Sequence, residues 1–381
     1  MSIYIDNAAT SFPKPEEVYN ETLNCMRNYA ANPGRSTHTM ALESSTKVSE
    51  TREILSDFFN ITSPFNMIFT SNATEGLNIG IKGVLKPGDH VISTVIEHNS
   101  VLRPLNSLSK KGVKVTLLAV DNYGKLNINS LRKEIQKNTK LIVINHASNV
   151  LGTLQYINTI GKIARDAGIL FMVDASQSAG TINIDVEKYN IDLLAFPGHK
   201  GLMGPQGTGG LFIRDGISMT NFKEGGTGSN SMSMTQPDFL PDKFESGTLN
   251  VPGIAGLCEG VKFIQKIGRR NIQKHEEGLI QYLLGEFKKM PYVKIYGSEY
   301  TEKRSAVISI NIDNMDSSEV GYLLNKKGIA VRTGYHCAAL IHPIIGTSKT
   351  GTVRLSPGYF NTYEEMEEVM KAIQEIYKGN V

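Results

Sequence analysis

Short apolar runs rich in β-branched residues alternate with helical patterns through the first two thirds of the chain. The runs cover residues 89–96, 113–120, 140–146, 168–174, 192–196 and 210–213. Between them, apolar residues recur at helical spacing, as at residues 74–85 and 158–167. This alternation predicts an α/β fold in which helices cover a largely parallel sheet.

The pattern changes after Pro252. Long amphipathic helices are expected at residues 254–267, 273–289 and 363–377, with a few strands between them. This part is expected to form a smaller α+β domain, whose boundary lies near residues 250–256. Residues 223–250 are rich in Gly, Ser, Thr and Asn and have little periodicity, which predicts a loop.

The composition narrows the classes of partner. The 381 residues carry 40 basic and 37 acidic side chains, and no basic block is interleaved with aromatic residues, so nucleic acid is not an expected partner. No apolar run reaches membrane-spanning length and the first residues do not resemble a signal peptide, so we expect a cytoplasmic protein without a membrane partner. Cys25, Cys258 and Cys337 are too scattered for a disulfide framework or a zinc site, and no metal site is predicted.

Several predicted strands end in polar residues. His98, Asn149, Asp174 and His199 each lie at or just beyond the carboxyl end of a predicted strand. Ligands of open α/β sheets bind at this edge, so we expect these side chains to form a site there.

Asp174 and Lys200 indicate the chemistry of that site, because each follows an apolar run and the two runs are consecutive. A lysine amine forms a Schiff base with the aldehyde of pyridoxal 5′-phosphate (PLP), and a carboxylate beside the pyridine nitrogen keeps that nitrogen protonated. Taken singly, each residue is more often a surface lysine or a turn-forming aspartate. The pair, together with an anion site, favours PLP.

An anion site is offered where an apolar strand gives way to a helix at residues 71–74. Free backbone N–H groups and the helix dipole at this point would hold a phosphate, although a plain helix start with Asn72 or Thr74 as N-cap is an equal alternative. His98 is a candidate for stacking on a planar ring, although a histidine at a strand end is more often structural.

Motifs along nearly the whole chain carry a family resemblance. They read YIDNAAT, NATEGLN, IEHNSVLRP, NHASNVLGT, VDASQSAG, GHKGLMGPQGTGG, FESGTLN, RTGYHCA and VRLSPGYFNT. The chain resembles the fold-type I PLP enzymes of the class V aminotransferase superfamily, and within it the group II, SufS-like cysteine desulfurases and selenocysteine lyases. The resemblance implies a large PLP-binding domain (15–250) with a mainly parallel seven-stranded sheet. It also implies an N-terminal segment (1–14) packed near the active site and the small domain, and a small α+β domain (251–381) that carries Cys337 and Arg354.

The resemblance also implies the roles of single residues. For the cofactor it implies Lys200 as the Schiff-base lysine, Asp174 as the pyridinium partner, Gln177 at the ring oxygen, His98 as stacking ring and proton carrier, Ala73, Thr74 and His199 at the phosphate, and Thr248 at the phosphate of the neighbouring subunit of a homodimer. For the substrate it implies Asn149 and Arg354 at the carboxylate, with Asn7, Ala8, Ala9 and Arg332 in the same pocket.

Cys337 favours sulfur transfer over transamination. It follows a strand and a glycine, so its thiol is expected on a loop, where Arg332 or His336 would stabilise a thiolate that accepts sulfur from cysteine as a persulfide. A buried, inert cysteine is the alternative, and it is the interpretation for Cys25 and Cys258. A protein that takes the sulfur onward is a possible partner.

Two features depart from the family pattern and leave alternatives open. Pro197 stands where the family has a Ser or Thr, which removes one phosphate hydroxyl, and His342 is added in the stretch after Cys337. A selenocysteine lyase with the same residues, or another class V transaminase or lyase, remains the alternative. A dehydrogenase is disfavoured because the first strand-to-helix turn lacks G-x-G-x-x-G.

Overall fold

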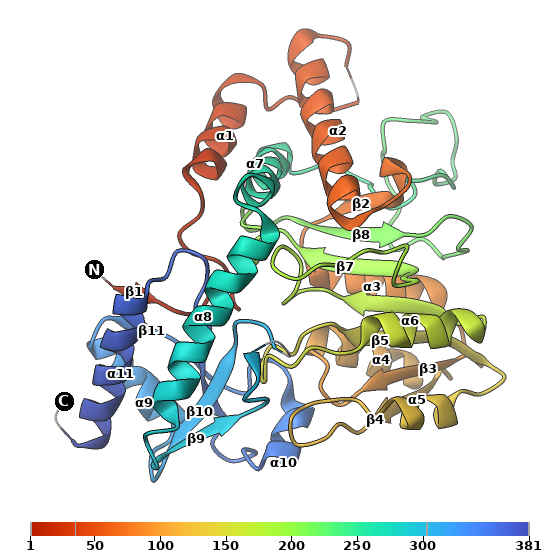
Figure 1. Ribbon diagram of the computed structural model, residues 1–381. Helices are drawn as coiled ribbons and strands as arrows, with labels where there is room; N and C mark the ends of the chain where they lie inside the picture. Colours follow the sequence, from red (N-terminus) through yellow and green to blue (C-terminus); the bar gives the residue numbers. More distant parts are fainter. Residues whose placement is uncertain (1, 35, 302–303, 380–381) are drawn as a thin grey trace.

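The computed structural model describes residues 2–34, 36–301 and 304–379, and its largest sheet has seven strands in the order β2-β8-β7-β6-β5-β3-β4 (Figure 1). The strands are β2 (Met67–Thr70), β3 (His90–Thr94), β4 (Lys114–Leu118), β5 (Thr139–Asn145), β6 (Leu170–Asp174), β7 (Leu193–Pro197) and β8 (Gly209–Ile213). Neighbours from β4 to β7 run parallel, whereas β8 is antiparallel to both β7 and β2. The predicted runs coincide with β3 to β8, so the mainly parallel sheet is confirmed.

Helices cover both faces of this sheet. On one face α3 (Ala73–Val84) and α4 (Asn99–Ser109) share a buried cluster with strand residues such as Ile68 and Leu141. On the other face lie α2 (Thr39–Phe59), α5 (Ile128–Glu134), α6 (Ile157–Asp166) and α7 (Val251–Ile267). Adjacent residues Ile68 and Phe69 belong to opposite clusters, as the two-residue period of a strand requires. The sheet is therefore buried on both sides, which explains its continuous apolar runs.

A second, antiparallel sheet with its own core follows in the C-terminal part. Its strands are β9 (Val293–Tyr296), β10 (Ile308–Ile312), β12 (Arg332–Gly334) and β13 (Thr352–Leu355), in the order β12-β13-β10-β9. α8 (Arg269–Phe287), α9 (Ser317–Lys326) and α11 (Tyr363–Tyr377) supply the helical side of the core, and the short elements nearby are η3 (Ala339–Ile341) and α10 (His342–Ile345). The helices predicted at residues 254–267, 273–289 and 363–377 are confirmed as α7 (Val251–Ile267), α8 and α11, whereas α9 was not predicted.

Helix α7 packs with the large sheet rather than with the second one. Its buried residues, including Ile254, Leu257 and Val261, belong to the cluster that also holds α2 and α6. The chain therefore passes from the core of the large sheet to the core of the second sheet at α8. The division of the chain at residue 250 stays a prediction.

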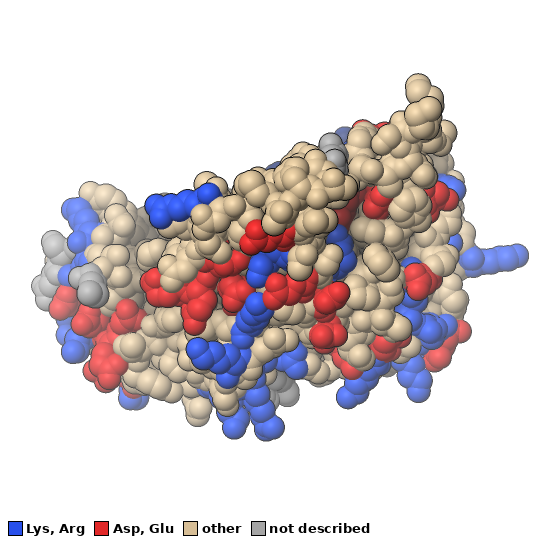
Figure 2. Space-filling view, turned by 90° about the horizontal axis from the view of Figure 1, so that it is seen from above, with Lys and Arg blue, Asp and Glu red and all other residues tan. Residues whose placement is uncertain are grey.

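The first residues of the chain connect the two cores. β1 (Ile3–Tyr4) pairs in parallel with β11 (Ile329–Ala330), and the segment then crosses to the turn after β7 before α1 (Glu16–Asn28) begins. At the top of Figure 1, α1, α2 and α7 lie together. Viewed from that side, acidic and basic side chains are intermixed (Figure 2), and ion pairs such as Lys262–Glu50 at 2.6 Å join α7 to α2. Among the described residues, no helix is both long and apolar enough to cross a membrane.

Candidate active site

A pocket of about 490 Å³ lies at the carboxyl ends of the parallel strands. Its walls come from residues 72–74, 98, 100, 145, 147, 149, 174, 176, 177, 197, 199 and 200. Eight side chains predicted for the cofactor or the substrate meet here: Ala73, Thr74, His98, Asn149, Asp174, Gln177, His199 and Lys200. The expectation that polar residues after separate strands converge at this edge is therefore confirmed.

Helix α3 presents its N-terminus to this pocket. The Asn72 side chain accepts a hydrogen bond from the Glu75 N–H at 2.9 Å, and Glu75 in turn accepts from the Ser71 N–H at 2.6 Å. These caps satisfy the groups beside the helix start, while Ala73 and Thr74 line the pocket. The positive end of the helix dipole and first-turn N–H groups of this kind favour an anion.

Ser100 was not predicted, and it joins two predicted residues. Its hydroxyl lies 2.8 Å from Thr74 Oγ1 and 2.9 Å from His98 Nδ1, and its N–H donates to the same ring nitrogen at 3.1 Å. His98 Nδ1 thus accepts, which leaves the ring proton on Nε2. Burial lowers the pKa of His98 despite the opposing charge of Asp174, so the ring is neutral at pH 7. The only feature of the sequence that could have indicated Ser100 is its place two positions after His98, at the helix start "HNS".

Asp174 and Lys200 belong to neighbouring strand ends and share the pocket. Asp174 closes β6 and is 4% exposed, and its Oδ1 accepts from the Ser176 N–H at 2.9 Å. Lys200 follows β7, and burial lowers its pKa to about 8, an effect that the Asp174 charge partly opposes. A lysine with this pKa has an appreciable neutral, nucleophilic fraction near neutral pH.

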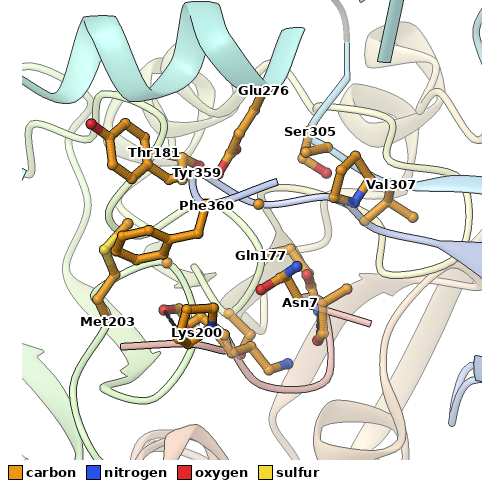
Figure 3. A pocket seen from close by; sticks show the side chains of 18 residues that line it. Asn7, Gln177, Thr181, Lys200, Met203, Glu276, Ser305, Val307, Tyr359 and Phe360 are labelled. Carbon is orange, nitrogen blue, oxygen red and sulfur yellow. Dashed lines mark hydrogen bonds between the residues drawn. The ribbon is translucent and has the colours of Figure 1, made fainter. Parts of the chain in front are cut away.

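A second cavity of about 590 Å³ adjoins the first at Lys200 and Gln177 (Figure 3). Asn7 and Ala8 line it, and Gln177 Nε2 donates to the Ala8 carbonyl at 3.0 Å. Asn7 Nδ2 donates to the Ser356 carbonyl at 3.1 Å. Glu276, from α8, also points into this cavity, and burial raises the pKa of its carboxyl to about 8.

Arg354 is almost fully buried, with 1% of its surface exposed. Its Nη2 donates to Asp6 Oδ1 at 2.6 Å and its Nη1 to the Asn149 carbonyl at 3.2 Å, while its Nε has no partner among the described residues. Arg332 lies directly opposite it in the β12–β13 register, so the two guanidinium groups share one face of the sheet. Two cations and one carboxylate leave a positive excess beside the pocket. Asp6 was not predicted, because only the fold reveals its pairing with a residue 348 positions away.

Cys337 lies on a loop after β12, as predicted, and its side chain is partly exposed. Both His336 and Cys337 have left-handed backbone conformations, with φ of 49° and 59°. Two bonds hold this turn on the large sheet's side: the Asn99 N–H donates to the Cys337 carbonyl at 2.8 Å, and Asn149 Nδ2 to the His336 carbonyl at 2.5 Å. The thiol is therefore carried on a fixed, strained turn next to the start of α4.

Of the two alternatives predicted for the neighbour of the Cys337 thiol, Arg332 is the one that bonds to the sulfur within the described residues. Its Nη2 lies 3.3 Å from the sulfur. The His336 ring is buried and its Nε2 lies 2.9 Å from Thr352 Oγ1, so the expected role of His336 is wrong. Burial lowers the pKa of His336 to about 2, which keeps the ring neutral.

Thr248 and Ala9, like Arg332, Arg354 and Cys337, are not among the residues that line either cavity. Thr248 is exposed and accepts from Asn32 Nδ2 at 3.4 Å, and Ala9 closes a turn by donating to the Asp6 carbonyl at 3.0 Å. Cys25 and Cys258 are buried in α1 and α7, which confirms their structural interpretation. Pro197 closes β7 and lines the pocket, where Thr74 and Ser100 supply the nearby hydroxyls.

The donor set of the pocket fits PLP. His199 Nδ1 is buried without a hydrogen-bond partner among the described residues, and burial lowers the pKa of this histidine to about 4. A neutral ring with an unused nitrogen and the N-terminus of α3 suit a phosphate. Asp174 suits a protonated pyridine nitrogen, and the Lys200 amine suits an aldehyde.

Comparison with known proteins identifies the family. A family model, "Aminotransferase class-V", matches residues 3–369. The chain belongs to the class-V aminotransferase family. A probable cysteine desulfurase of Methanothermobacter thermautotrophicus is 34% identical over 98% of this chain and 94% of its own length, and one of Pyrococcus abyssi is 35% identical over 99% and 94%.

Solved structures of other proteins have the same fold as this chain. The apo structure of a cysteine desulfurase from Thermococcus onnurineus NA1 superposes with a TM-score of 0.93 at 34% identity, covering 99% of this chain and 95% of the other. A NifS-like protein gives a TM-score of 0.88 at 29% identity, with both chains fully covered. The fold-type I assignment and the relationship to PLP-dependent cysteine desulfurases are confirmed.

Proposed function

We propose that this chain is a PLP-dependent cysteine desulfurase, which converts L-cysteine to L-alanine and transfers the sulfur to Cys337 as a persulfide. One observation carries the proposal. A lysine–aspartate pair suited to PLP lies in a pocket, and the adjoining turn carries a partly exposed thiol whose sulfur is 3.3 Å from an arginine. The names of the relatives support the same substrate.

The paired arginines would bind the substrate carboxylate. Arg332 and Arg354 lie opposite each other on β12 and β13, and Asp6 balances only one of the two charges. A guanidinium offers its donors in a planar fork that matches a carboxylate, which a lysine does not. The Asn149 carbonyl and Asp6 orient Arg354 beside the pocket.

When bound, PLP would supply an electron sink for the bond broken at the substrate Cα. The neutral Lys200 amine is the base that takes the Cα proton and returns it, and its pKa of about 8 suits that exchange near neutral pH. Asp174 would hold a proton on the pyridine nitrogen through its carboxylate. His98 presents a neutral ring with its proton on Nε2, so it can donate at that atom.

Cys337 would take the sulfur. Its thiolate attacks the sulfur of the substrate, so that an S–S bond forms while the Cβ–S bond of cysteine breaks. The electron pair of the broken bond stays on the former Cβ, where a proton completes the methyl group of alanine. Arg332 Nη2 donates to the sulfur at 3.3 Å and would hold it in place for this attack.

An absorbance spectrum of the purified protein before and after cysteine, with alanine and sulfide quantified, tests the proposal. We expect a visible band from bound PLP, its change on adding cysteine, and alanine formation. Lys200→Ala should abolish the band and turnover, whereas Cys337→Ala should keep the band and stop persulfide formation. A colourless protein that ignores added PLP would refute the proposal, and faster alanine release from selenocysteine, independent of Cys337, would favour a lyase.

We also infer a homodimer that shares its sites. Thr248 is exposed and lies outside both cavities of its own chain, which is consistent with contact to the phosphate site of a second copy. Met232 and Met234, on the same loop, are almost fully exposed, which is unusual for large apolar side chains. Sedimentation analysis of the protein, and of Met232→Ser with Met234→Ser, tests this inference. A protein that accepts the sulfur would reach Cys337 through the part of its side chain that is exposed to solvent.

A further inference from the structure

Lys14 lies at the end of the N-terminal segment, and nothing in the family motifs points to it. Its Nζ donates to the His199 carbonyl at 2.8 Å and to Ser11 Oγ at 2.7 Å. Its backbone N–H donates to the Tyr19 hydroxyl at 2.9 Å, which fixes the residue at the start of α1. The side chain therefore crosses from the N-terminal segment to the turn that follows β7.

The contacts of Lys14 bracket Lys200. The His199 carbonyl belongs to the peptide bond that precedes Lys200, and Ser11 Oγ donates to the Lys200 carbonyl at 3.0 Å. Because Lys14 donates to the Ser11 oxygen, the one hydroxyl proton of Ser11 faces two carbonyls, that of Lys200 at 3.0 Å and that of His199 at 3.3 Å, and the Lys200 carbonyl is the nearer. Lys14 thus contacts the peptide bond before Lys200 directly, and it contacts the carbonyl of Lys200 through Ser11.

Further contacts show that the turn has little freedom. The Ser11 N–H donates to the His199 carbonyl at 3.0 Å and Thr10 Oγ1 does so at 3.1 Å. On the opposite side, a Cβ at Gly201 would collide with the Ala179 carbonyl. A carbonyl has two lone pairs, so the donors around His199 compete, and the charged one makes the strongest bond.

Lys14 differs from other half-buried lysines in the partners of its charge. No ion pair of Lys14 is present in the described parts of the chain, whereas other half-buried lysines such as Lys47 have one. Burial lowers the pKa of Lys14 to about 8. Keeping an unpaired ammonium out of water is unfavourable, and a neutral donor would satisfy the same carbonyl. The position of this ammonium beside Lys200 therefore indicates that Lys14 acts on Lys200.

We propose that Lys14 is a positioning residue for Lys200, which it holds in the orientation that reacts with the cofactor aldehyde. This inference rests on the proposed function, in which Lys200 carries PLP. Loss of the Lys14 bonds leaves the fold in place, because β1, β11 and the Ser11 and Thr10 contacts remain. It loosens the turn and lowers the fraction of chains in which the amine points into the pocket.

The experiment measures how fast the cofactor-stripped protein takes up PLP, well below its unfolding temperature. Lys14→Met should slow uptake about tenfold, the size expected for one charge-assisted hydrogen bond. Lys14→Arg should restore most of the rate, and Lys14→Gln should fall between. Lys371→Met removes an exposed lysine of α11 and should match the wild type. The unfolding temperature of the stripped protein should change little in all four variants.

Borohydride reduction followed by mass spectrometry separates the two levels of the argument. If the wild type yields no PLP adduct on Lys200, the proposed function and this inference both fail. If the adduct forms on Lys200 but Lys14→Met takes up PLP at the rate of Lys371→Met, the proposed function stands and the positioning role is overturned. Should Lys14→Met not fold, the same comparison is made with Lys14→Gln and Lys14→Arg, where equal wild-type rates overturn it.

Discussion

The Nη2 atom of Arg332, the first residue of β12, lies 3.3 Å from the Sγ atom of Cys337, which follows the end of that strand. The guanidinium places a positive charge beside the sulfur, while the two left-handed residues 336 and 337 fix where the sulfur points. The position of the thiol thus depends on a side-chain contact and on a backbone turn, which mutations can separate.

Replacing Arg332 by Met should slow alkylation of Cys337 by iodoacetamide at neutral pH by about threefold to tenfold, the size of one hydrogen bond, because the sulfur loses the donor that holds it in one position. Mass spectrometry of the labelled peptide measures this rate. Cys25 and Cys258 are buried and should stay unlabelled in the folded protein, which gives an internal control. Equal labelling rates for Arg332→Met and the wild type would show that the contact has no effect on reactivity.

The rate of PLP uptake by the stripped protein should depend on pH through Lys200. Only the neutral amine attacks the aldehyde, so the rate should rise about tenfold per pH unit below pH 8 and level off above it. Asp174→Asn removes a charge that raises the pKa of Lys200, so the midpoint should move to lower pH. Asp166→Asn, an exposed position, is the control. A rate that still climbs steeply past pH 9 contradicts this pKa.

Glu97 should make the stability of the fold depend on pH. It is fully buried, Thr94 Oγ1 donates to it at 2.6 Å, and burial raises its pKa to about 8. The folded state keeps it protonated, while the unfolded chain ionises above its ordinary value near 4.5. Its favourable contribution is therefore complete below pH 4.5 and falls by about 1.4 kcal/mol per pH unit up to pH 8.

The Glu97→Gln variant lacks that dependence. Urea unfolding of both proteins from pH 5 to 8 should show the free energy of unfolding of the variant gaining steadily on the wild type. Glu134→Gln replaces an exposed carboxyl and is the matched control. A constant difference between variant and wild type over this range would mean that Glu97 is ionised in the folded protein.

Pro197→Ser should tighten PLP binding. Pro197 lines the pocket beside His199, and a serine there would add a hydroxyl near the expected phosphate. One hydrogen bond to a charged group stabilises binding by about 1.5–3 kcal/mol, so the dissociation constant should fall about tenfold or more. Fluorescence titration with PLP measures it, and Pro197→Ala separates the added hydroxyl from the lost ring. Equal affinities for the serine and alanine variants would show that no such bond forms.

The sequence predicted the sheet and the convergence of the pocket for a clear physical reason. A strand buried on both faces must be apolar throughout, so β3 to β8 appear as continuous runs whose carboxyl ends are easily recognised. Parallel neighbours bring those ends to one edge, which is why His98, Asp174 and Lys200 could be grouped without coordinates.

Pairings across long stretches of chain could not be predicted in this way. Asp6 binds Arg354 and Lys14 binds the His199 carbonyl because β1 pairs with β11, and two-residue strands leave no periodic signal. The choice between Arg332 and His336 as the neighbour of the thiol depended on side-chain direction. A turn with two left-handed residues sets that direction. Glycine is the usual sequence signal for a left-handed residue, and neither residue is a glycine.

The parallel pairing of β1 with β11 also sets when the pocket can be completed. Ile3 pairs with Ile329, and Asp6 meets Arg354 across nearly the whole length of the polypeptide. During synthesis the large sheet can assemble from residues that have already left the ribosome. The side of the pocket that contains Asp6 and Arg354 cannot form until residues just before the last helix, α11, have emerged. A nascent chain therefore exposes the Lys200 amine to solvent long before Arg332 and Arg354 are synthesised.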